Sequence, residues 1–305
     1  NMAKWGHPDV VCTSAYPEAF AGLGSFFDVI AADVPCSGEG MFRKDEDAVA
    51  GWSLSNVDKC AQLQRDIVTD AWQLLRPGGL LIYSTCTFNR QENDGNVEWI
   101  RDNLGAGVLD LPLGYEGLIA TEYGCSLVPG FVPGEGQYCA ALRKEGEPSL
   151  RGARTPRRAR PVRTADRRSA DCVGSLFGIP VSVRTKGDLL TALPACISAE
   201  LQEFEIALPL LSAGCAAGRI KGRDFVPDAD LALCTALRED AFTRLGVDRE
   251  LALAFLHRDN IVLGDAEPGL ILLCYQNVPL GFVKNLGRRC NSLLPQSRRI
   301  RMDIE

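Results

Sequence analysis

Two cysteines stand shortly after apolar runs that are predicted to form strands. Cys36 follows the run FFDVIAA at 26–32, and Cys86 follows the run LLIYS at 80–84. In an open parallel sheet, ligands bind just beyond the carboxyl ends of the strands, and neighbouring strands lie only ~4.8 Å apart. Pro35 and the glycines after Cys36 give that loop a rigid entry and an open turn. The placement therefore predicts that both thiols face one pocket.

A pocket with two thiols and a carboxylate could methylate cytosine at carbon 5. That carbon is unreactive until a thiolate adds to carbon 6, which makes carbon 5 able to take a methyl group from a sulfonium donor. The ring nitrogen at position 3 also needs an acid or a hydrogen bond, which Asp33 could supply. Neither histidine, His7 or His257, lies in such a loop, so a hydrolase of the Cys-His kind would lack its base.

Residues 1–145 alternate between predicted strands and helices. Continuous apolar runs predict strands, and apolar residues spaced three or four apart predict helices. Alternation of this kind indicates an α/β fold with a parallel sheet that helices cover on both faces. The expected strands are at 9–12, 26–32, 80–84 and 137–143, and the expected helices are at 55–74 and 93–103.

The longer of these helices has predicted ends. Ser55, with Asp58 three residues later, is expected to form a capping box at its start, and the run RPGG at 76–79 is expected to stop it. The apolar stripe that should face the core consists of Cys60, Leu63, Ile67, Ala71 and Leu74.

The rest of the chain is expected to form a linker and a smaller α+β unit. After a catalytic portion at 1–148, residues 149–172 are rich in Arg and Pro and lack apolar periodicity, which predicts a linker. A connecting subdomain at 173–212 and a C-terminal domain at 213–305 follow. In the C-terminal domain, helices are expected at 231–245 and 248–257, and a hairpin is expected to turn at 276–277.

Basic residues cluster although the formal net charge is −6. Residues 151–168 hold eight arginines against one acid, and residues 281–302 hold six basic residues and no acid. Phosphate backbones respond to such local clusters more than to net charge, so RNA is the expected partner. The candidate RNA contacts are Arg43, Lys44, Lys284 and Arg288.

Cysteine spacing and hydropathy exclude several other classes of protein. The twelve cysteines include no C-x-x-C pair, so no zinc site or other metal site is predicted. The sequence contains no apolar run of the ~20 residues that cross a bilayer and no cleavable signal. We therefore expect a cytoplasmic, monomeric protein with free thiols that binds neither metal nor membrane.

Two long motifs resemble those of a known family. The run DVPCSGEGMFRKD at 33–45 and the run RPGGLLIYSTCTFNRQEN at 76–93 resemble the Nop/Sun family of RNA cytosine-carbon-5 methyltransferases, and among them the RsmF-like bacterial ribosomal RNA enzymes. The resemblance implies a partial class I, Rossmann-like methyltransferase sheet, with S-adenosylmethionine as methyl donor. A looser similarity at 213–301 implies a PUA-like RNA-binding domain.

The same resemblance implies roles for individual residues. It makes Cys86 the nucleophile and Cys36 the residue that helps to release the product. Asp33 is placed against both the donor and the target base, and Pro35 beside the donor. DNA cytosine methyltransferases use the Pro-Cys cysteine as nucleophile instead, so the Thr-Cys-Thr loop around Cys86 distinguishes the two classes.

Two hypotheses of different classes remain. The family binds its donor through a Gly-rich loop and an acidic residue that would precede Asn1, and the opening run NMAKWG is typical of the end of a helix. We therefore expect the donor-binding segment of a larger protein to be missing here. The chain is either part of an active RNA methyltransferase or an inactive RNA-binding fragment or paralogue.

Overall fold

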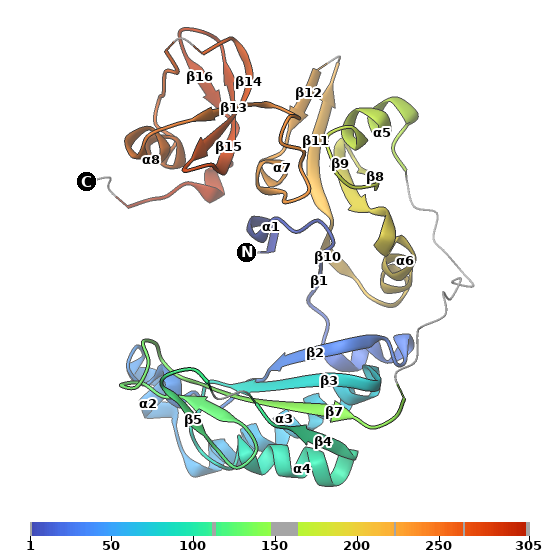
Figure 1. Ribbon diagram of the computed structural model, residues 1–305, viewed down its shortest axis with the longest axis vertical. Coiled ribbons are helices and arrows are strands. Elements are labelled where there is room, and N and C mark those ends of the chain that lie inside the picture. Colours follow the sequence, from blue (N-terminus) through green and yellow to red (C-terminus); the bar gives the residue numbers. More distant parts are fainter. Residues whose placement is uncertain (1, 112–113, 148–163, 223, 265, 303–305) are drawn as a thin grey trace. The chain divides into compact units, whose positions relative to one another are not determined.

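The computed structural model describes residues 2–111, 114–147, 164–222, 224–264 and 266–302 (Figure 1). The chain divides into two compact units, one of residues 15–153 and one of residues 1–14 with 154–305. In the described part of the chain, no helix is both long and apolar enough to span a membrane.

The first unit is built on one mixed sheet, which confirms the α/β fold class. Among its described strands, the order is β2-β3-β7-β6-β5, and β4 also pairs with β7. The pair β2·β3 is parallel, whereas β3·β7 is antiparallel. The expectation of a sheet that is parallel throughout is therefore wrong. The strands are β2 (Phe27–Asp33), β3 (Leu75–Thr85), β4 (Ala106–Leu109), β5 (Leu118–Ala120), β6 (Cys125–Leu127) and β7 (Gln137–Lys144).

Helices α3 (Leu54–Leu74) and α4 (Asp94–Leu104) pack on one face of this sheet. The core there includes Leu81 and Tyr83 from β3, which are 1% and 0% exposed. The shorter helices of the unit are η1 (Pro17–Leu23), η2 (Glu39–Met41) and α2 (Glu46–Gly51). The helix predicted at 93–103 is thus confirmed as α4.

Strand β2 is an exposed edge, which corrects the prediction of a buried strand at 26–32. Its side chains are exposed or half-buried, and Val29 is 53% exposed. Within the described part of the chain β2 pairs with β3 alone, so β2 is an edge strand. A run of apolar residues does not reveal how many neighbours a strand has.

Strand β3 begins earlier than the sequence indicated. The helix ends at Leu74, as predicted, but the run RPGG at 76–79 is not a separate stop signal between the elements, because it lies inside β3. The parallel register with β2 jumps there, since Phe27 is opposite Leu75 whereas Val29 is opposite Leu80. The glycines are accommodated as an irregularity in the strand.

The start and the buried stripe of α3 also differ from the prediction. Its N-cap is Ser53, whose hydroxyl accepts a hydrogen bond from the Asn56 N–H at 3.2 Å, so the capping box at Ser55 is wrong. Leu63, in the predicted stripe, is 47% exposed. The helix instead buries a neighbouring face that includes a glutamine: Val57, Ala61, Gln64, Val68, Ala71, Trp72 and Leu74.

The second unit contains smaller sheets. Strand β1 (Val11–Thr13) pairs with β10 (Leu210–Ala213), and so lies outside the sheet of the two cysteine loops. A four-stranded sheet has the order β12-β11-β9-β8. Its strands are β8 (Val181–Lys186), β9 (Leu189–Pro194), β11 (Cys215–Lys221) and β12 (Asp224–Pro227), and the helices of this region are α1 (Met2–Trp5), α5 (Arg167–Gly174), η3 (Ala195–Ile197), α6 (Ser198–Ala207) and α7 (Ala229–Leu233).

A further sheet forms the C-terminal part, in the order β13-β14-β15-β16. The predicted hairpin is confirmed, and its turn residues Gln276 and Asn277 have φ of 48° and 67°. Helix α8 confirms the helix predicted at 248–257, with Asp248 as N-cap. The elements are β13 (Thr243–Gly246), α8 (Arg249–His257), β14 (Gly269–Tyr275), β15 (Val278–Asn285), β16 (Cys290–Ser292) and η4 (Gln296–Arg298).

The helix predicted at 231–245 is wrong, because α7 ends at Leu233. Tertiary pairing replaces helical hydrogen bonds there: Leu237 forms a β-bridge with Phe177, and the Arg238 N–H donates to the Leu176 carbonyl. Most of the predicted linker at 149–172 lies outside the described residues, and its described part includes the first turns of α5. The proposed domain boundaries therefore stay predictions.

Candidate active site

The cysteine loops meet at the carboxyl ends of β2 and β3. These strands are parallel neighbours, and Asp33 at the end of β2 is opposite Ser84. Cys86 follows Ser84 by two residues, and Cys36 follows Asp33 by three. Their Sγ atoms lie 3.1 Å apart. Both residues are half-buried. The two thiols that the sequence placed at one sheet edge therefore lie in direct contact.

Backbone contacts hold the two loops together. The Val34 N–H donates to the Ser84 carbonyl at 3.1 Å, which extends the sheet pairing, and the Gly40 N–H donates to the Cys86 carbonyl at 2.7 Å. A Cβ atom on Gly40 would lie 2.5 Å from the Cys86 carbonyl oxygen and 3.0 Å from that of Glu135. This approach is possible because residue 40 has no side chain.

A Gly40→Ala substitution should therefore displace the Cys86 loop. The added methyl group meets backbone oxygens that cannot rotate away, so we expect a loss of about 1–3 kcal/mol in the free energy of unfolding. Gly51→Ala is the matched control, because nothing lies within 4 Å of a Cβ at that position. Equal thermal unfolding temperatures for the two variants would contradict the close approach of Gly40 to Cys86.

The two thiols differ in their electrostatics. Burial, followed by the hydrogen bond with the Cys86 side chain, raises the pKa of Cys36 to about 12. Cys36 therefore keeps its proton at neutral pH and can donate its S–H to the Cys86 sulfur.

Asp33 lies exposed at the end of β2. One oxygen of its carboxylate accepts hydrogen bonds from the Ser84 hydroxyl and from Gln137 Nε2, both at 3.1 Å. These contacts orient the carboxylate beside the cysteine loops. Pro35, between Asp33 and Cys36, is also exposed.

The four candidate RNA contacts are all exposed. Arg43 and Lys44 lie near Glu135, at 3.9 Å and 3.5 Å, in the same unit as the cysteines. Lys284 lies 3.9 Å from Asp224 in the other unit, as does Arg288. Most of the arginines at 151–168 lie outside the described residues.

Sequence reasoning missed a buried polar network behind the cysteine loops. Glu92 and Gln64 are both 0% exposed, and the Gln64 Nε2 donates to the Glu92 carboxylate at 2.7 Å and to the Pro35 carbonyl at 2.9 Å. The one available signal was a glutamine that shares a helical face with Val57, Ala61 and Val68, where an apolar residue is usual.

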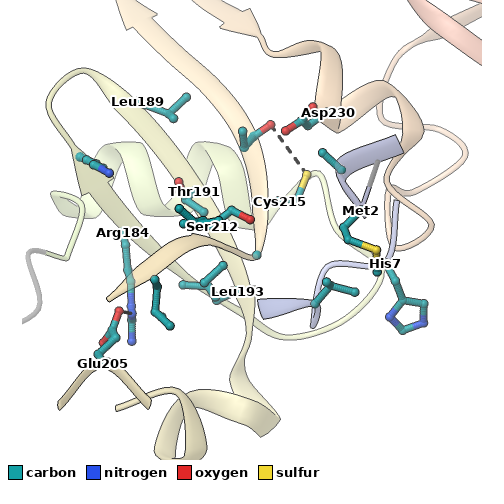
Figure 2. A pocket seen from close by; sticks show the side chains of 18 of the residues that line it. Met2, His7, Arg184, Leu189, Thr191, Leu193, Glu205, Ser212, Cys215 and Asp230 are labelled. Atoms are coloured by element: carbon teal, nitrogen blue, oxygen red, sulfur yellow. Dashed lines mark hydrogen bonds and ion pairs between the residues drawn. The ribbon is translucent and has the colours of Figure 1, made fainter. Parts of the chain in front are cut away.

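A large cavity lies elsewhere, in the second unit (Figure 2). It has a volume of about 740 Å³ and is lined mostly by residues of β9, β10, α6 and the N-terminal segment. Arg184 and Glu205 form an ion pair at 2.6 Å in its wall. Among the described residues, no cluster of His, Cys, Asp or Glu could hold a metal ion.

Family models match both units. Residues 8–143 match the model described as 16S rRNA methyltransferase RsmB/F, and residues 242–300 match the one described as Methyltransferase RsmF PUA domain. Over these residues the chain matches the RsmB/F methyltransferase family. The Nop/Sun resemblance and the expected PUA-like domain are thereby confirmed.

Curated relatives agree with the RsmB/F assignment. The chain is 30% identical over 313 residues to "Ribosomal RNA small subunit methyltransferase F" of Citrobacter koseri and 30% identical over 315 residues to the protein of that name from Escherichia coli O81. Each alignment covers 97% of this chain and 64% of the relative. The chain thus spans less than two thirds of these relatives.

A solved structure is also similar to part of the chain. It is titled "The crystal structure of NSun6 from Pyrococcus horikoshii with SFG" and is 28% identical, covering 44% of this chain and 34% of the other, with a TM-score of 0.37.

Proposed function

We propose that the protein is an S-adenosylmethionine-dependent methyltransferase that forms 5-methylcytosine in ribosomal RNA. The observation that carries this proposal is the 3.1 Å contact between the Cys36 and Cys86 sulfurs at the ends of two parallel strands. The match to the RsmB/F family supports methyl transfer, and the names of its relatives support ribosomal RNA as the substrate.

Cys86 is the proposed nucleophile. Its sulfur forms a bond to carbon 6 of cytosine, and the electron pair of the carbon 5–carbon 6 double bond moves toward carbon 5 and the ring nitrogen at position 3. Asp33, oriented by Ser84 and Gln137, would hold a proton at that nitrogen. Carbon 5 then takes the methyl group.

Cys36 is proposed to assist release. Carbon 5 must pass its remaining proton to solvent, and the electrons of that C–H bond restore the double bond while the bond between carbon 6 and sulfur breaks. The Cys86 sulfur leaves with the electrons of that bond. Cys36 lies one hydrogen-bond length from the leaving sulfur, which suits it to this step.

Asp33 and Pro35 would hold the methyl donor. An exposed carboxylate at the carboxyl end of a parallel strand fits a ligand with a positive sulfonium group. The donor supplies the methyl group and no other chemistry. Because the chain spans 64% of its relatives' length, these two residues are proposed as part of the donor site and not as all of it.

RNA binding is proposed for both units. Arg43 and Lys44 follow Cys36 closely and would contact the phosphates next to the target cytosine. Lys284 and Arg288 would contact RNA from the PUA domain, the segment at 242–300. We propose that the protein acts as a monomer in the cytoplasm, where ribosomal RNA is found.

Bisulfite mapping of ribosomal and transfer RNA tests the proposed function. In a strain that lacks the gene, a cytosine of ribosomal RNA should lose its methyl group, and restoring the complete gene should return it. A restored gene with Cys86→Ala is the control and should leave that cytosine unmethylated. An unchanged methylation map would favour the alternative of an RNA-binding paralogue without activity.

A further inference from the structure

Glu92 is a fully buried carboxylate immediately behind the cysteine loops. It lies between β3 and α4, and it is 0% exposed. A buried charge is costly unless hydrogen bonds satisfy it. The groups that donate to Glu92 are neutral N–H groups from three separate parts of the chain, so this carboxylate joins elements that are distant in sequence.

The three donors connect Glu92 to the loops of both cysteines. The backbone N–H of Ser37, the residue after Cys36, donates to Glu92 Oε2 at 3.0 Å. Gln64 Nε2 donates to the same oxygen at 2.7 Å and to the Pro35 carbonyl at 2.9 Å. Glu92 therefore fixes the chain on both sides of Cys36, directly at Ser37 and through Gln64 at Pro35.

The other carboxylate oxygen reaches the second loop. Asn89 Nδ2 donates to Glu92 Oε1 at 2.8 Å and lies 3.0 Å from the hydroxyl of Thr87, the residue after Cys86. The Thr87 hydroxyl is in turn 3.1 Å from the Ser37 hydroxyl. These contacts close a ring of hydrogen bonds that runs from one cysteine loop to the other.

Tyr83 anchors the backbone of Glu92 from the core. Its hydroxyl donates to the Glu92 carbonyl at 2.6 Å. Burial raises the pKa of Tyr83 well above its ordinary value, so this donor stays protonated at neutral pH. The main chain and the carboxylate of Glu92 are thus both held.

We propose that Glu92 is a positioning residue that keeps the Cys36 sulfur against the Cys86 sulfur. It would not touch the substrate. The inference rests on the proposed function for its catalytic meaning, but the effect on the geometry of the two thiols can be measured without any methyl transfer.

A variant of a second buried carboxylate distinguishes an effect on the position of the thiols from an effect on stability alone. Asp94, two residues later, is 8% exposed and accepts hydrogen bonds from the hydroxyls of Tyr138 and Thr121, both at 2.8 Å. Its partners are in β7 and in the turn after β5, and not in the cysteine loops. Asp94→Asn should therefore cost stability without moving the thiols, whereas Glu92→Gln should do both, because the new amide N–H groups face existing donors.

The experiment measures how fast iodoacetamide alkylates Cys86 at a series of pH values, by mass spectrometry of the Cys86 peptide. In Glu92→Gln, the dependence of the Cys86 alkylation rate on pH should become that of Cys36→Ala. Adding Glu92→Gln to Cys36→Ala should not change this dependence further. Asp94→Asn should keep the wild-type profile. If Glu92→Gln does not fold, Asn89→Ala, which removes the Asn89 hydrogen bonds to Thr87, Ser37, Glu39 and Glu92 but keeps the Glu92 carboxylate, should move the profile in the same direction.

A wild-type alkylation profile in Glu92→Gln, with a lowered unfolding temperature like that of Asp94→Asn, would overturn the proposal. In the complete protein, Glu92→Gln should also lower kcat by about 100-fold, because a displacement of about 1 Å is enough for such a loss. If the profile moves as expected while the complete wild-type protein does not methylate RNA, the positioning role stands and the proposed function fails.

Discussion

Cys86→Ala in the complete protein should abolish methyl transfer to RNA and leave the fold intact. The sulfur is the only atom of this residue that can add to carbon 6, and without that addition carbon 5 of cytosine is unreactive. The residue is half-buried, so loss of one sulfur atom leaves little empty space. Transfer of a radiolabelled methyl group to RNA and the thermal unfolding temperature would be measured together.

Cys60→Ala is the control for this variant. Cys60 is another half-buried free cysteine of the same unit, on α3, and has no place in the proposed mechanism. It should retain full turnover. Wild-type turnover by Cys86→Ala would remove Cys86 as the nucleophile.

Cys36→Ala should have an equally large but different effect. A covalent protein–RNA adduct should accumulate. Attack by Cys86 does not need Cys36, whereas release is proposed to depend on it. A denaturing gel after incubation with RNA and methyl donor should show a slowly migrating band that persists with time. The wild-type protein should show little of this band, because each adduct is resolved.

The double variant Cys36→Ala with Cys86→Ala identifies the attacking residue. It should form no adduct, because the sulfur that would bond to carbon 6 is gone. If Cys36→Ala releases product at the normal rate with no slow band, Cys36 has no role in release. A band that persists in the double variant would assign the bond to a different residue.

The sequence predicted the cysteine site well because strand ends are local features. An apolar run followed by a loop is enough to place Cys36 and Cys86 at one sheet edge, and their sulfurs are indeed in contact. The turn at 276–277 and the helix that begins after Asp248 were predicted for the same reason, since both depend on a few adjacent residues.

Features that depend on distant parts of the chain were not predictable in this way. The exposure of β2 follows from its single neighbour among the described strands, and the early end of α7 follows from the pairing of Leu237 with Phe177. Glu92 belongs to the site although nothing in its local sequence indicates burial, and the only local signal for Gln64 is its place on an apolar helical face. Their role emerges from hydrogen bonds to loops that are 28 to 55 residues away.

The contact between the two sulfurs also makes the site sensitive to oxidation. A disulfide bond is about 2.05 Å long, and the sulfurs already lie 3.1 Å apart. A peroxide would convert one thiol to a sulfenic acid, which condenses with the other thiol and releases water. The resulting disulfide would link the end of β2 to the end of β3. It would remove the proposed attacking thiol and the proposed releasing thiol together, so the protein must be prepared and assayed with a thiol reductant.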